Sequence, residues 1–111
     1  MFKQVFSGLF SGGKSLAISE LPALIKQKNV ILLDVRESHE FVAGHIPQAV
    51  NQPLSQLDQF QGDKDKDYLV ICQSGMRSQR ACRFLREQGY QATNVSGGMN
   101  AWTGPRKEGK K

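Results

Sequence analysis

Hydrophobic residues form two kinds of run along this chain. Residues 29–34 and 68–72 are continuous runs of mostly Val, Ile and Leu, which is typical of strands covered on both faces of a parallel sheet. Shorter segments between and after them are bounded by helix-capping residues and carry apolar positions three or four residues apart, which indicates helices. Strands that alternate with helices predict an α/β fold, with a mainly parallel central sheet, right-handed crossovers and helices on both faces.

Turn and capping residues refine this order of elements. Pro22 suits the first turn of a helix, where a missing N–H costs little, and Ser19 is the expected N-cap of that helix. Gly44 and Gly89 are expected to end the helices before them. The polar segment 61–67 is expected to be a loop. The other expected elements are strands at 15–19, 49–53 and 92–95, helical segments at 20–28, 37–45, 54–60 and 78–88, and a short helix opened by the glycine turn of 96–102.

The length of 111 residues allows one small domain with a single core. We expect an N-terminal amphipathic segment with a Gly/Ser linker at 1–13, the folded domain at 14–104 and a basic mobile tail at 105–111. Apolar residues in the first ten positions follow a helical spacing, but only one basic residue accompanies them. Membrane contact through residues 1–10 is therefore an alternative, and a helix that packs on the domain or on a partner, or is partly disordered, is favoured.

The net charge of +5 is unevenly distributed along the chain. The last six residues hold four basic residues and one acidic residue, a net +3, so the body of the domain is nearly neutral. This distribution argues against a nucleic-acid partner and favours a solvated end. The two cysteines form no CxxC pair and no secretory leader precedes them, which predicts reduced thiols and a cytoplasmic location.

Cys72 ends a predicted central strand, at the sheet edge where α/β folds bind ligands. The N–H groups of a tight loop that leads into a helix favour the thiolate, and a thiolate is a competent nucleophile. Gly75 allows a positive φ or a close approach to an anion. Arg77 either offers a cation to an anionic substrate or braces the loop. Ser78 suits the N-cap or the first turn of the following helix.

Three motifs together resemble the rhodanese-type sulfurtransferases. The active-site loop of that family is similar to "CQSGMRS" at 72–78, and its upstream segment, with a Gly-His-Ile-Pro turn, is similar to "LLDVRESHEFVAGHIPQAVNQP" at 32–53. Its closing glycine-tryptophan signature is similar to "VSGGMNAW" at 95–102. The resemblance covers residues 16–103 and implies the rhodanese-like three-layer fold with a five-stranded sheet. It also implies a cysteine that takes sulfane sulfur from an anionic donor such as thiosulfate and passes it to a thiol or cyanide.

Carried onto this chain, the resemblance makes Cys72 the sulfur acceptor and predicts a persulfide intermediate. Four residues separate Cys72 from Arg77, one fewer than in the related cysteine phosphatases, and a smaller cradle suits sulfur better than phosphate. One cysteine serving two half-reactions predicts ping-pong kinetics. The backbone amides expected to cradle the transferred sulfur belong to Gln73, Ser74, Gly75, Met76, Arg77 and Ser78.

Other reactive residue types receive simpler interpretations. Asp34 and Arg36 are expected to brace the loops beside the site, with a catalytic role as the alternative. His39 and His45 have no cysteine near them in sequence, so no metal or other cofactor is expected, and His45 is expected to form a hydrogen bond in its turn. Cys82 is expected to pack in the core, with a resolving thiol as the alternative.

A second function stays open beside the enzyme. Within the loop, Gln73, Ser74 and Met76 supply no cation besides Arg77 to attract a doubly charged donor. A persulfide carrier that serves a dedicated protein partner and turns over free thiosulfate poorly is therefore the alternative. A scaffold without catalysis is disfavoured, because such domains typically lack the cysteine that this chain keeps at position 72.

Overall fold

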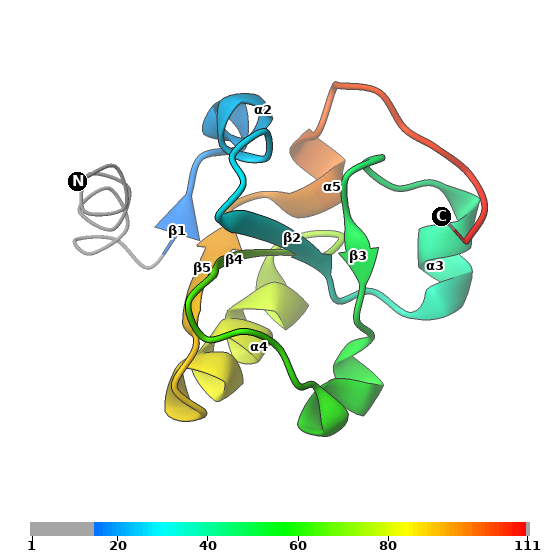
Figure 1. Ribbon diagram of the computed structural model, residues 1–111. Coiled ribbons are helices and arrows are strands. Elements are labelled where there is room, and N and C mark those ends of the chain that lie inside the picture. Colours follow the sequence, from blue (N-terminus) through cyan, green and yellow to red (C-terminus); the bar gives the residue numbers. More distant parts are fainter. Residues whose placement is uncertain (1–14, 111) are drawn as a thin grey trace.

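Five parallel strands form the centre of the molecule (Figure 1). The computed structural model of the chain describes residues 15–110, so the predicted segment at 1–13 lies outside the described residues. The strand order is β1-β5-β4-β2-β3, which confirms the predicted parallel α/β fold with five strands. The strands are β1 (Ser15–Leu16), β2 (Val30–Asp34), β3 (Val50–Asn51), β4 (Asp67–Ile71) and β5 (Gln91–Val95).

Helices cover both faces of this sheet, as the sequence predicted (Figure 1). Side chains alternate along β2 and β4, so that Leu32 and Leu69 face one core cluster while Leu33 and Val70 face the other. The first cluster packs against α2 and α5, and the second packs against η2 and α4. The helical elements are η1 (Ile18–Glu20), α2 (Leu21–Leu24), α3 (Ser38–Ala43), η2 (Leu54–Gln59), α4 (Met76–Glu87) and α5 (Gly98–Ala101).

The first helix is shorter than expected and has no side-chain cap. Ser19 lies inside the 3-10 turn η1 and does not cap a helix, so that part of the prediction is wrong. Pro22 does occupy the first turn of α2, where its lack of an N–H costs nothing. The helix ends after Leu24, where Ile25 is the C-cap and its N–H donates to Leu21 O at 3.0 Å, and both Leu21 and Leu24 are buried.

Asp67 was expected to be in a polar loop, but it is the buried first residue of β4. Its backbone pairs with β2 and β5, and its carboxylate accepts a hydrogen bond from Asn29 Nδ2 at 3.1 Å. Gly89 lies just after α4 with φ of +96°, at the position that the sequence predicted for the end of this helix. Elsewhere the element boundaries differ from those expected by a few residues.

The basic segment after Gly104, predicted to be a mobile tail, has mostly exposed residues and a backbone that is hydrogen bonded to the domain. Residues 105–110, which we call the C-terminal strap, lie along the domain and pass over the end of α3 (Figure 1). Lys107 pairs with His45 through two backbone hydrogen bonds of 2.7 and 2.9 Å, and the N–H of Gly109 donates to Val42 O at 2.9 Å. These backbone hydrogen bonds hold the strap against the domain. Sequence composition does not reveal them.

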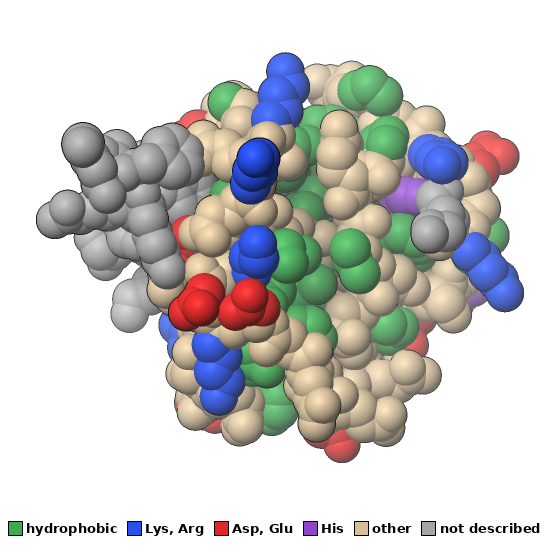
Figure 2. All heavy atoms as spheres, in the orientation of Figure 1, with side chains coloured by type: hydrophobic (Ala, Val, Ile, Leu, Met, Phe, Trp, Pro, Cys, Tyr) green, Lys and Arg blue, Asp and Glu red, His purple; other side chains and the backbone are tan. Residues whose placement is uncertain are grey.

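On the face drawn in Figure 2, charged side chains are interspersed with hydrophobic ones. Between residues 15 and 110, the large hydrophobic side chains that are exposed are Val42, Val50 and Met76. Met76 is 72% exposed and begins α4 directly after the Cys72 loop. Within that same range, no helix has the length and apolar character needed to cross a membrane.

Candidate active site

Cys72 follows β4 at the carboxyl edge of the sheet, and a short loop leads from it into α4. Gly75 is the N-cap of α4 and has φ of +104°, a left-handed conformation that favours glycine. Ser78 therefore lies in the first turn of the helix and not at its cap, which decides between the two predicted positions. This turn brings the start of α4 back toward the cysteine.

The Cys72 sulfur is buried and surrounded by hydrogen-bond donors. The N–H groups of Gly75 and Ser78 donate to Sγ at 3.0 and 3.3 Å. The Ser78 hydroxyl lies 3.3 Å from the same sulfur and is also hydrogen bonded to Asn94 Oδ1 at the end of β5. Of the loop residues predicted to surround the sulfur, Gly75 and Ser78 thus form a cradle of hydrogen bonds around it.

The cradle lowers the pKa of the Cys72 thiol. Burial alone would raise this pKa, but hydrogen bonds from the Ser78 side chain and from the backbone N–H groups of Ser78, Gly75 and Ser74 outweigh it. Cys82 shows the opposite balance, because burial raises its pKa to about 12. Cys82 is only 1% exposed, in agreement with the expectation that it packs in the core.

Arg77 is bound by a carboxylate from another element. Its Nη1 and Nη2 atoms donate to Glu40 Oε1 and Oε2 of α3 at 2.7 and 2.9 Å. The Arg77 guanidinium lowers the pKa of Glu40 from 4.5 to about 2, and Glu40 in turn raises the pKa of Arg77. Of the two roles that the sequence left open, this geometry matches the brace, which ties the loop to α3.

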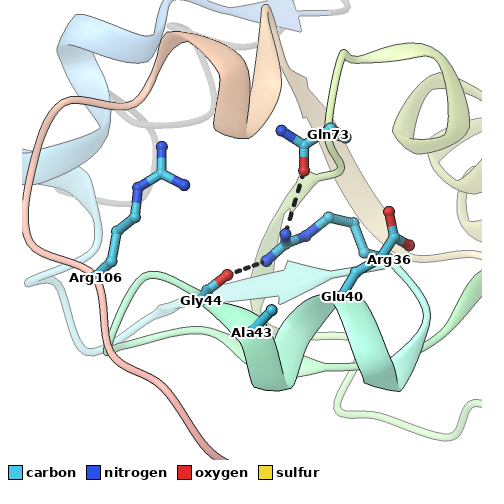
Figure 3. Close-up of a pocket in the computed structure, with 6 residues that line it drawn as sticks. All are labelled: Arg36, Glu40, Ala43, Gly44, Gln73 and Arg106. Carbon is cyan, nitrogen blue, oxygen red and sulfur yellow. Dashed lines mark hydrogen bonds between the residues drawn. The ribbon is translucent and has the colours of Figure 1, made fainter.

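Asp34 and Arg36 form a buried ion pair beside the loop, with Arg36 Nη2 2.8 Å from Asp34 Oδ2. The same guanidinium donates to Gly44 O at 2.7 Å and to Gln73 Oε1 at 3.3 Å (Figure 3). Arg36 therefore joins the end of β2, the end of α3 and the Cys72 loop. These contacts match the bracing position that we expected for both residues.

The start of α5 supports the loop from the other side. The N–H of Met99 donates to Cys72 O at 2.8 Å, and the N–H of Asn100 donates to Gln73 O at 3.0 Å. A Cβ on Gly98 would lie 2.3 Å from Cys72 O, so only glycine allows this approach. Close packing against the loop thus accounts for the second glycine of the "VSGGMNAW" motif.

An open pocket of about 300 Å³ lies beside the loop (Figure 3). Of the residues predicted for the site, Arg36 and Gln73 line it, whereas Ser74 on the loop and Met76 at the start of α4 are exposed. The sequence did not point to Glu40 or Arg106, which also line the pocket, because both come from segments distant from the loop in sequence. The lining residues are Arg36, Glu40, Ala43, Gly44, Gln73 and Arg106.

Neither histidine belongs to a metal-ligand cluster in the part of the chain that the structure describes. The buried ring of His45 stacks on Phe41 with centroids 3.7 Å apart. His45 Nδ1 is hydrogen bonded to Phe41 O at 2.8 Å, as expected for a histidine in this turn. His39 is exposed on α3.

A parallel α/β sheet with a cradled cysteine at the end of a central strand defines a class of thiol-dependent α/β domains. Within that class, the family model for the rhodanese-like domain matches residues 17–105, so the chain belongs to the rhodanese-like domain family. A putative sulfurtransferase of Bacillus subtilis, YtwF, is 45% identical over 92 residues, which cover 77% of this chain and 89% of that protein.

Two further relatives agree with this assignment. The thiosulfate sulfurtransferase GlpE of Shewanella oneidensis is 35% identical over 95 residues, covering 83% of this chain and 94% of that one. The crystal structure of a rhodanese-related protein from Thermoplasma volcanium superposes with a TM-score of 0.78 at 34% identity, covering 86% of this chain and 98% of that chain. A role in rhodanese-like sulfur transfer is therefore supported.

Replacing Ser78 with alanine is expected to move the reactivity of Cys72 to higher pH. The hydroxyl favours the charged sulfur, so its loss raises the pKa of the thiol, and less thiolate is present at any pH below the new value. The measurement is the rate of alkylation of Cys72 by iodoacetamide as a function of pH.

Ser74→Ala is the matched control, because Ser74 affects the Cys72 pKa through its backbone N–H and its side chain is exposed. Its pH profile should coincide with that of the wild type. A Ser78→Ala profile that also coincides with the wild type would contradict the assigned role of the hydroxyl.

Proposed function

We propose that this domain is a sulfurtransferase that moves sulfane sulfur from a donor such as thiosulfate to a thiol or cyanide through a Cys72 persulfide. The observation that carries the proposal is the convergence of the Gly75 N–H, the Ser78 N–H and the Ser78 hydroxyl on Cys72 Sγ, at 3.0 to 3.3 Å. Groups that stabilise a thiolate at this place also stabilise the terminal sulfur anion of a persulfide.

In the first half-reaction, the Cys72 thiolate attacks the outer sulfur of thiosulfate. A new S–S bond forms to Cys72, the S–S bond of the donor breaks, and its electron pair leaves with sulfite. The product on the protein is a persulfide anion. The N–H groups of Gly75 and Ser78, which donate to Sγ, support the binding of this charge.

In the second half-reaction, cyanide or a thiolate attacks the terminal sulfur. The S–S bond to Cys72 breaks, and the thiolate is restored as thiocyanate or a small persulfide departs. No metal or organic cofactor takes part in either step. Because the first product, sulfite, leaves before the acceptor reacts, the two substrates follow ping-pong kinetics.

Mass spectrometry of the thiosulfate-treated protein tests the proposal. The intact protein is expected to gain the mass of one sulfur atom, cyanide is expected to remove it, and peptide mapping should place it on Cys72. The Cys82→Ala variant, which alters the buried second cysteine, should gain sulfur in the same way. A gain located on Cys82, or no gain with any sulfane donor, would refute the proposal.

A persulfide carrier for a protein partner is the second candidate. Two observations favour it. The guanidinium of Arg77 is hydrogen bonded to Glu40 and so is less available to attract an anionic donor. The hydrophobic Met76 is 72% exposed beside the loop, where a protein partner could contact it. A carrier would accept sulfur from a separately prepared protein persulfide while gaining none from thiosulfate. Sulfur gain and multiple turnover with thiosulfate would instead favour the enzyme.

A further inference from the structure

Arg36, Arg77 and Arg106 lie at or beside the Cys72 loop, and they differ in whether a carboxylate neutralises their charge. Arg36 is paired with Asp34 at 2.8 Å and Arg77 with Glu40 at 2.7 Å, so a carboxylate matches each of these cations. Within residues 15–110, the side chain of Arg106 is hydrogen bonded to backbone carbonyl groups and has no acidic partner. The pocket beside the loop therefore keeps a positive charge, and Arg106 carries it.

The fold holds Arg106 at this place. Its Nη2 atom donates to Met99 O at 3.0 Å and to Trp102 O at 3.2 Å, at the end of α5. The N–H of Met99 donates to Cys72 O at 2.8 Å, so one residue contacts both the arginine and the loop. The backbone pairing of Lys107 with His45 fixes the strap next to Arg106.

The pocket that Arg106 lines adjoins the Cys72 loop at Gln73, and Arg106 itself is exposed to solvent. Figure 3 shows Arg106 on the opposite side of the pocket from Arg36 and Gln73. Nη2 is used by the two carbonyl groups, and a guanidinium has further N–H donors that can bind an oxyanion. A cation that is already held in position loses less conformational entropy on binding than a freely moving one.

We propose that Arg106 is the specificity-determining residue for anionic sulfur donors, a role that rests on the proposed persulfide chemistry of Cys72. A thiosulfate-type donor carries its transferable sulfur on a negatively charged sulfonate group. Arg106 offsets the repulsion between this dianion and the Cys72 thiolate. When the outer sulfur bonds to Cys72 and the donor S–S bond breaks, the electron pair leaves with sulfite, whose charge Arg106 stabilises.

Steady-state kinetics of Arg106→Gln, with thiosulfate as donor and cyanide as acceptor, test this role. In a ping-pong reaction, kcat/KM for the donor reports the first half-reaction, and kcat/KM for the acceptor reports the second. We expect kcat/KM for thiosulfate to fall about tenfold, as for loss of one charge-assisted contact. The value of kcat/KM for cyanide should stay within about twofold of the wild type.

Charge and fold are separated by further variants. Arg106→Lys keeps the charge and should recover part of the lost kcat/KM, whereas Arg83→Gln, an exposed arginine of α4, should leave both values unchanged. Methanethiosulfonate transfers the same sulfur with one negative charge fewer, so its kcat/KM should fall less than that of thiosulfate in Arg106→Gln. Thermal unfolding of each variant checks that the domain remains folded.

The failure of this inference is distinguishable from failure of the proposed function. If the wild type gains no sulfur from any donor, the persulfide chemistry of Cys72 is refuted. If the wild type turns over thiosulfate and Arg106→Gln does so with the same kcat/KM, only the role of Arg106 is refuted. The role of Arg106 would also be refuted if Arg106→Gln lost as much kcat/KM for cyanide as for thiosulfate. The same holds if Arg83→Gln lost as much kcat/KM for thiosulfate as Arg106→Gln.

Discussion

Replacing Cys72 with alanine is expected to abolish sulfur transfer. The variant lacks the atom that bonds to the donor sulfur, so turnover should fall by about 10⁴-fold or more, to the background rate. Cys72→Ser should be equally inactive, because a serine hydroxyl in the same cradle does not ionise near neutral pH. The measurement is thiocyanate formation from thiosulfate and cyanide at equal protein concentrations.

Cys82→Ala is the matched control for this loss. Both cysteines are buried, but hydrogen bonds lower the pKa of Cys72, whereas burial raises that of Cys82 to about 12. Cys82→Ala should therefore keep its activity while losing some core packing. Activity that persists in Cys72→Ala but disappears in Cys82→Ala would reverse the assignment of the nucleophile.

Among the variants proposed for this protein, Arg36→Met is expected to lose the most free energy of unfolding. Asp34 is fully buried, and the Arg36 guanidinium donates to both of its carboxylate oxygens at 2.8 to 3.2 Å. Removal of the guanidinium leaves a buried carboxylate without its ionic partner, which costs about 3–5 kcal/mol. The free energy of unfolding, measured by urea denaturation near neutral pH, should fall by this amount.

Comparing Arg36→Met with the double variant Asp34→Leu/Arg36→Met separates the cost of the unpaired carboxylate from the cost of losing the arginine side chain. Because the double variant removes both charges, it should be more stable than Arg36→Met alone. Arg83→Met, at an exposed position on α4, should change the free energy of unfolding by less than about 0.5 kcal/mol. A loss below about 1 kcal/mol for Arg36→Met would show that the pair does not support the loop as described.

Sequence reasoning succeeded where local patterns were sufficient. The continuous apolar runs predicted β2 and β4, and Gly89 was correctly expected to follow the end of α4. It failed at Ser19, which is a good capping residue but lies within a 3-10 turn. It did not reveal the hydrogen bonds of the strap, whose residues are mostly exposed, because composition does not report backbone pairing with a distant residue such as His45.

The sequence by itself determined the α/β order of elements and placed Cys72 in a loop between a buried strand and a helix. Burial and turn formation depend on near neighbours, so spacing and residue type reveal them. Only the tertiary structure decided that Glu40 forms an ion pair with Arg77, that Asn94 contacts Ser78 and that Arg106 lines the pocket. The contacts of Arg77 and Ser78 join residues 16 or more positions apart in the sequence, and the place of Arg106 depends on how the strap packs. The sheet order β1-β5-β4-β2-β3 brings these distant residues together, and local sequence patterns do not report it.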